Sequence, residues 1–156
     1  MTYALDPERS KQVLSRCVTD VFAETAFIDV QNRESGSPSN ATRCASINVL
    51  SPLSCSVRLS FTQSTLDRIA ESLYDDEAKG KPGAKKNIED SMLEILNIIS
   101  GSFLTNYFGS GTEFLLELPQ YQYGDDASPG EQVARLRMDA EGEPIEISLN
   151  SVRYRY

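Results

Sequence analysis

The chain contains no histidine, and its three cysteines, Cys17, Cys44 and Cys55, lie far apart without CxxC spacing. The missing imidazole excludes Ser-His-Asp and Cys-His forms of nucleophilic catalysis. Three scattered thiols also cannot complete the four ligands of a zinc site built from cysteine and histidine. We therefore expect free, buried thiols in a reducing compartment and no metal bound by this chain.

Positive charge is scarce. The chain has 15 Lys and Arg against 23 Asp and Glu, a formal net charge of −8. Such a surface repels phosphate backbones, and no cluster of basic residues with interleaved aromatics offsets it. We expect no nucleic-acid partner. The acidity either keeps the protein in solution, which we favour, or steers it toward a basic patch on another protein.

Long apolar runs are missing as well. The sequence contains no run of 18 apolar residues, about the length needed to span a bilayer, so we expect no membrane partner. The segment Met1–Asp6 lacks the basic and apolar regions of a signal peptide, and cytoplasm is the default location. The chain has 156 residues, of which 40% are hydrophobic and 24% charged. We therefore expect one domain, residues 1–156, that is large enough to bury a hydrophobic core.

The first half of the sequence predicts a helix, a hairpin and a second helix. Asp6 as N-cap and Pro7 open a helix that runs to Ala26, and a loop rich in Ser, Gly, Pro and Asn follows over Gln31–Asn40. The remaining elements are two strands, Ala45–Leu50 and Ser54–Phe61, joined by a turn at Ser51-Pro52, a helix capped by Ser64, and a charged connector, Asp75–Gly83. In the second strand Cys55, Val57, Leu59 and Phe61 alternate inward while Ser56, Arg58 and Ser60 point outward.

The C-terminal part predicts strands in hairpins. Thr112–Leu118 reads as a strand ending at Pro119, and Tyr121–Tyr123 either continues it or pairs with it. After an acidic loop, Gly124–Gly130, the segments Gln132–Met138 and Ile145–Leu149 form a hairpin around Ala140–Glu143. Ala134, Leu136 and Met138 should face Ile145, Ile147 and Leu149. The whole pattern predicts an α+β fold with three helices and about six strands in a mostly antiparallel sheet.

The run Lys85–Phe108 predicts one long amphipathic helix with two distinct faces. At 3.6 residues per turn the apolar residues Ile88, Met92, Ile95, Leu96, Ile99 and Phe103 gather on one side. Spacings of four, three and four residues place Asp90, Glu94, Asn97 and Gly101 on the other. Glycine within a helix costs about 1 kcal/mol relative to alanine, so Gly101 points to the close approach of another molecule.

A solvated helix face is the plain alternative for Glu94 and Asn97, since such pairs are common. The same holds for the acidic runs Asp75–Glu77 and Asp125–Asp126, which lack the spacing of an EF-hand and are expected to be solvated turns. Tyr107 and Phe108 are expected in the core rather than in a binding site.

Glu94-Ile-Leu-Asn97-Ile-Ile-Ser-Gly101 resembles the E-x-x-N-x-x-x-G signature of the CheC/CheX/FliY chemotaxis phosphatases. Asp90 and Pro119 stand where that family has an acid or serine and a proline, and the order of elements is similar from Ala45 onward. The chain has one copy of the signature, as in CheX, whereas CheC has two. A CheX-like fold is therefore expected.

The resemblance implies a phosphatase that hydrolyses the aspartyl phosphate of a CheY-type response regulator. Asn97 would orient the attacking water, Glu94 would dock to the regulator's lysine, and Gly101 would leave room for the partner. Asp90 would support either Glu94 or the first turns of the helix. The regulator would supply Mg²⁺, with no cofactor bound by this chain, and a homodimer is expected. Two alternatives remain: a non-catalytic module that only binds the regulator, and an unrelated oligomerisation domain that adds an unpaired strand, Ile145–Tyr156, to a neighbour's sheet.

Overall fold

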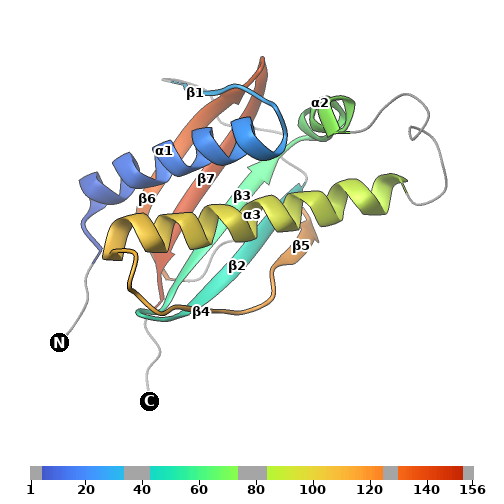
Figure 1. Ribbon diagram of the computed structural model, residues 1–156. Helices are drawn as coiled ribbons and strands as arrows, with labels where there is room; N and C mark the ends of the chain where they lie inside the picture. The colour runs from blue at the N-terminus through green and yellow to red at the C-terminus, as the bar shows by residue number, and fades with distance from the viewer. Residues whose placement is uncertain (1–4, 34–42, 74–83, 125–129, 153–156) are drawn as a thin grey trace.

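The computed structural model describes residues 5–33, 43–73, 84–124 and 130–152, whose elements are drawn in Figure 1. In chain order they are α1 (Pro7–Thr25), β1 (Val30–Asn32), β2 (Arg43–Ser51), β3 (Cys55–Phe61), α2 (Gln63–Leu73), α3 (Ala84–Phe108), β4 (Leu115–Leu116), β5 (Gln120–Tyr123), β6 (Glu131–Ala140) and β7 (Glu143–Ser151). The predicted α+β class is confirmed.

The described strands form one antiparallel sheet in the order β1-β6-β7-β3-β2-β4, with β5 also paired to β2. The strand β7 lies inside the sheet, paired with β6 on one side and β3 on the other. The expectation of an unpaired strand from Ile145 onward is therefore wrong up to Ser151, and residues 153–156 lie outside the described part. This removes the basis of the oligomerisation alternative.

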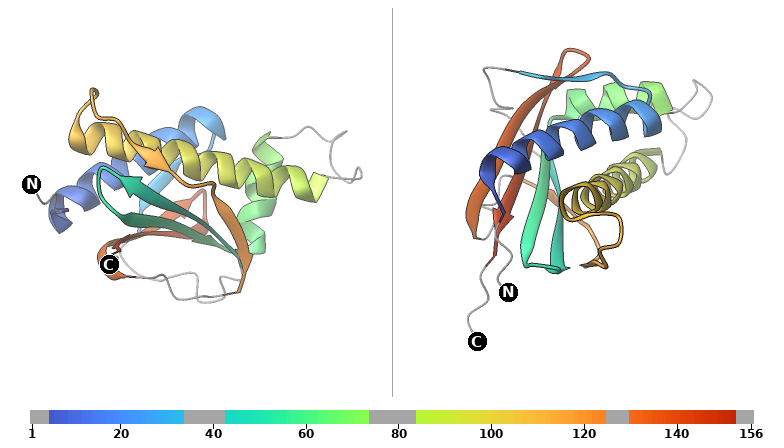
Figure 2. Two further views of the ribbon diagram at one scale, coloured as in Figure 1. Left: turned by 90° about the horizontal axis from the view of Figure 1, so that it is seen from below. Right: turned by 60° about the vertical axis from the view of Figure 1, so that its left-hand side comes forward.

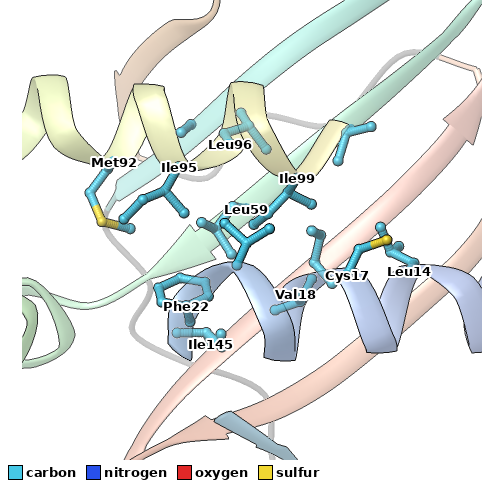
Figure 3. Packing of buried hydrophobic residues seen from close by; sticks show 14 of the residues in the cluster. Leu14, Cys17, Val18, Phe22, Leu59, Met92, Ile95, Leu96, Ile99 and Ile145 are labelled. Atoms are coloured by element: carbon cyan, nitrogen blue, oxygen red, sulfur yellow. The ribbon is translucent and has the colours of Figure 1, made fainter. Parts of the chain in front are cut away.

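The helices cover one face of the sheet, as the two views of Figure 2 show. The axes of α1 and α3 run side by side over that face. Their buried apolar side chains belong to one core cluster with those of the strands. Figure 3 shows Phe22 and Val18 of α1 near Ile95 and Ile99 of α3, with Leu59 of β3 beneath. Each such fully buried side chain stabilises the fold by about 1.5–3 kcal/mol.

The predicted hairpin is confirmed in its register. Ala134 pairs with Leu149, Leu136 with Ile147, and Met138 with Ile145. The turn between β6 and β7 places Glu141 and Gly142 at φ 51° and 93°, a left-handed conformation that glycine adopts without strain.

Several local predictions differ from the structure. The cap of α2 is Thr62 rather than Ser64, because the Thr62 hydroxyl accepts from the Thr65 N–H at 3.2 Å. The strand predicted over Thr112–Leu118 is only Leu115–Leu116, and Gln31 lies in the short strand β1 rather than in a loop. The connector Asp75–Gly83 and most of Gly124–Gly130 lie outside the described residues.

The second predicted strand, now β3, alternates as expected but is buried on both faces. Ser56 and Arg58 point away from the helices, yet they are only 4% and 8% exposed. Because β3 lies between β2 and β7, neighbouring side chains flank both residues on that face, and Ser56 stands between Asn48 and Asn150.

Candidate active site

The long helix α3 has 25 residues, which corresponds to a length of about 37 Å. It ends at Phe108 and is capped by Gly109, whose N–H donates to the Thr105 carbonyl at 2.9 Å and whose φ of 109° suits a glycine cap. The first turn of α1 holds this end in place. The Asp6 N–H donates to the Tyr107 hydroxyl at 2.7 Å, and the Arg9 guanidinium donates to the Tyr107 carbonyl at 2.7 Å.

The apolar face of α3 is buried as predicted. The residues of this face are Ile88, Met92, Ile95, Leu96, Ile99 and Phe103, none more than 7% exposed. Tyr107 is buried as expected, and Phe108 is half-buried and packs against the core. The helix is thus fixed on the sheet by one side.

The opposite face brings together the four residues singled out in the sequence. Asp90, Glu94 and Asn97 are exposed and Gly101 is half-buried. They follow one another along the helix over about 16 Å. We call these four residues the polar file. The predicted arrangement is therefore present on the surface of the molecule.

The side chains of Asp90, Glu94 and Asn97 make no hydrogen bond or ion pair with any residue that the structure describes. Other polar side chains of α3 behave differently. The Ser102 hydroxyl donates to the Cys17 thiol at 3.3 Å, and the Asn106 amide donates to the Ser102 carbonyl at 2.8 Å. The carboxylate of Glu94 and the amide of Asn97 are consequently available to an external partner.

The space above Gly101 is partly filled by this chain itself. A Cβ built on Gly101 would lie 3.6 Å from the ring of Phe114, an ordinary van der Waals distance. Phe114 belongs to the segment that follows α3 and was not singled out in the sequence. Its place after the turn Gly109-Ser110-Gly111 offered a weak signal, since such a turn can fold a segment back onto the helix.

The described surface includes a smaller and a larger hollow. The smaller, about 130 Å³, borders the polar file and is lined by Glu94 and Ser91 together with Thr25, Leu73, Ile95 and Ile98. The larger, about 450 Å³, lies between the first turn of α1 and strand β6, and its basic residues are Lys11, Arg33, Arg135 and Arg137. Of these two hollows, only the smaller is lined by a residue of the polar file, Glu94, and Asn97 lines neither.

A tyrosine cluster lies beside the first half of α3. The Tyr123 hydroxyl donates to the Glu89 carboxylate, and this hydrogen bond raises the pKa of Tyr123. Burial, with the nearby Glu89 charge, raises the pKa of Tyr121. Glu89 is thereby engaged within the chain, unlike Glu94. The helical spacing that places Glu94 in the polar file leaves Glu89 outside it.

The thiols are free and buried, as predicted. Burial raises the pKa of Cys17, and it raises the pKa of Cys55 to about 12. Both groups are therefore neutral at physiological pH and poor nucleophiles. Among the described residues no group of three or more His, Cys, Asp or Glu is arranged to hold a metal ion.

No helix of the described residues is long and apolar enough to cross a membrane. No curated protein matches the sequence. The fold, in contrast, is shared with several solved structures. The CheX chemotaxis protein of Desulfovibrio desulfuricans superposes with a TM-score of 0.72 at 13% identity, over 92% of this chain and 99% of that one. CheX of Vibrio vulnificus gives a TM-score of 0.72 at 12% identity, over 94% and 99%.

A third similar structure is a complex. It is the CheX–CheY–BeF3–Mg²⁺ complex of Borrelia burgdorferi, which matches with a TM-score of 0.70 at 18% identity, over 96% of this chain and 100% of that one. These likenesses confirm the predicted CheX-like fold. The sequence model described as chemotaxis phosphatase CheX matches residues 43–139, more than half of the chain and the whole of α3. The chain therefore belongs to the CheX family of chemotaxis phosphatases.

Proposed function

We propose that this protein hydrolyses the aspartyl phosphate of a CheY-type response regulator, using Asn97 to orient water and Glu94 to dock the regulator. The observation behind the proposal is that both side chains stand exposed on α3 without a partner in the described chain. Family membership supports the phosphatase activity, and the CheX–CheY complex of the Borrelia relative supports the choice of partner.

The reaction needs little covalent chemistry from the phosphatase. Water attacks the phosphorus, the bond between phosphorus and the carboxyl oxygen breaks, and the products are the regulator's free aspartate and inorganic phosphate, which takes up the proton of the water. Such a transfer depends on an in-line nucleophile and on neutralised charge more than on a strong base. A protein without histidine can therefore catalyse it.

Asn97 suits the positioning of that water. Its amide oxygen can accept a hydrogen bond from the water, and its NH₂ group can donate to a phosphoryl oxygen. An amide cannot remove a proton at neutral pH, so its contribution is orientation, which can supply a large share of a barrier reduction. The exposed position on α3 lets it enter a partner's site, and no deep pocket is required because the substrate is another protein's surface.

Glu94 precedes Asn97 by nearly one turn on the same face, and its carboxylate is free to form an ion pair with a lysine of the regulator. Asp90 lies one turn earlier and would reinforce the negative potential at Glu94. We further propose that the divalent metal, Mg²⁺, is bound by the regulator and not by this chain. In that case Glu94 and Asn97 add docking and water placement to a site that already neutralises the phosphoryl charge.

The test is the rate of phosphate release from a phosphorylated response regulator of the same cell, with and without this protein. We expect acceleration by the wild type and a loss of about 100-fold or more in Asn97→Ala, because the attacking water is no longer positioned. The matched control is Asn106→Ala, which removes another exposed amide from α3, one that bonds within the chain. Equal rates for wild type and Asn97→Ala, or no acceleration by the wild type, would contradict the proposal. Tight binding without acceleration would instead identify a non-catalytic regulator-binding module.

A further inference from the structure

The segment after α3 folds back beside the polar file and is anchored at both ends. The Phe114 ring lies over Gly101, and Leu115 and Leu116 pair with the end of β2. The Glu117 N–H donates to the Asn48 carbonyl at 2.9 Å. These contacts fix the backbone of residues 114–117, so the side chains of this segment have defined positions on the surface.

This segment exposes three large apolar side chains within five residues of the sequence. Phe114 is 39% exposed, Leu115 57% and Leu118 87%. Single exposed apolar residues are normal on a protein surface, whereas three of them within five residues of a segment beside the polar file point to an interaction site. We call Phe114, Leu115 and Leu118 the apolar rim. The large apolar side chain Ile98, next to Asn97 on α3, is also 38% exposed.

The apolar rim is continuous with the polar file. Gly101 lies one helical turn beyond Asn97, a rise of about 6 Å, and Phe114 lies against Gly101. A protein whose phosphoaspartate reaches Asn97 must therefore extend over or beside this ring. Specific protein complexes bury roughly 800 Å² on each partner, far more than the file alone offers. The exposed acids Glu113 and Glu117 lie in the same segment, Glu113 before Phe114 and Glu117 between Leu115 and Leu118.

From this geometry we propose that the apolar rim is the affinity-determining part of the regulator-binding surface. Its partner is the surface of the phosphorylated regulator next to the phosphoaspartate, with apolar side chains facing Phe114 and Leu118 and basic groups facing Glu113 and Glu117. The inference rests on the proposed function. The polar file supplies the chemistry, and the rim supplies the apolar contact that holds the complex together.

The test separates affinity from chemistry with steady-state kinetics on the phosphorylated regulator. Leu118→Ser is the main variant, because an 87% exposed side chain contributes little to the fold. We expect KM to rise about 10-fold, the effect of losing one strong interface contact, with kcat unchanged. The control is Val133→Ser on β6, a half-buried apolar side chain that the strand order places about 19 Å away, toward the other edge of the sheet. Its KM should not change, and thermal unfolding of both variants checks that they are folded.

An unchanged KM in Leu118→Ser, with Asn97→Ala still inactive, overturns the inference and leaves the proposed function standing. If the wild type does not accelerate hydrolysis, the proposed function fails, and calorimetric binding of the regulator tests the rim: weaker binding by Leu118→Ser supports it, and equal or absent binding overturns it. A change in oligomeric state with KM unchanged also overturns it, because the rim then serves a second copy of this chain.

Discussion

The two faces of α3 differ in how far their side chains are buried and in whether they contact the rest of the chain. On one face six apolar side chains from Ile88 to Phe103 are buried, and each is constrained by neighbours in α1 and the sheet. On the other face Asp90, Glu94 and Asn97 have no partner among the described residues. The first face is explained by the protein's own packing. The second is not, which is why an external molecule is the natural explanation of its residue types.

The largest expected effect comes from breaking the buried face. Phe103→Ala removes a fully buried ring, and we expect the free energy of unfolding to fall by about 3–5 kcal/mol, from lost burial and the cavity left behind. Chemical denaturation measures it. Asn97→Ala is the counterpart on the exposed face and should change the same quantity by less than about 0.5 kcal/mol. Similar losses in both variants would mean that the two faces do not differ as described.

A smaller effect is expected from neutralising the free carboxylate of the exposed face. Glu94→Gln keeps the shape of the side chain and removes the charge that would pair with the regulator's lysine. Hydrogen bonds to charged groups contribute about 1.5–3 kcal/mol, so KM for the phosphorylated regulator should rise by roughly one order of magnitude or more. The rise should shrink at high salt, because screening weakens the wild-type ion pair. Glu131→Gln, an exposed acid on β6, serves as control, and an equal shift there would refute a local ion pair.

The smallest effect is expected from Gly101→Ala, which tests whether the exposed face of α3 needs glycine for packing within the chain or for contact with a partner. The ring of Phe114 would meet an added methyl group at an ordinary contact distance, so packing within the chain does not require glycine there. Gly101→Ala should therefore raise the free energy of unfolding by up to about 1 kcal/mol through better helix propensity. Denaturation and phosphate release are measured together. A more stable but less active variant would locate the need for glycine in the complex, whereas a destabilised variant would show that the chain itself needs it.

Much of the fold follows from periodicity in the sequence. The spacing of Met92, Ile95 and Ile99 gives the buried face of α3, and strict alternation gives the register of Ala134 against Leu149. The polar file was predictable for the same reason, because helical geometry alone places Glu94 and Asn97 together.

What the sequence did not reveal depends on contacts between distant segments. The interior position of β7 follows from its pairing with β3. The local sequence of Ile145–Ser151 does not predict that pairing, because it depends on a strand far away in the chain. The strand predicted over Thr112–Leu118 is short because only Leu115 and Leu116 form ladder pairs with β2. Phe114 was missed because its contact with Gly101 arises from the path of the chain after α3 and not from a motif.

The attachment of α3 to α1 has a consequence for binding. Tyr107, in the last turn of α3, receives hydrogen bonds from Asp6 and Arg9, and the Arg9 guanidinium lies 4.5 Å from the centre of its ring. The helix is thus locked at its C-terminal end as well as along its buried face. A partner that arrives at Glu94 and Asn97 meets a preorganised surface, and the conformational entropy of ordering that helix has already been lost during folding rather than in the encounter.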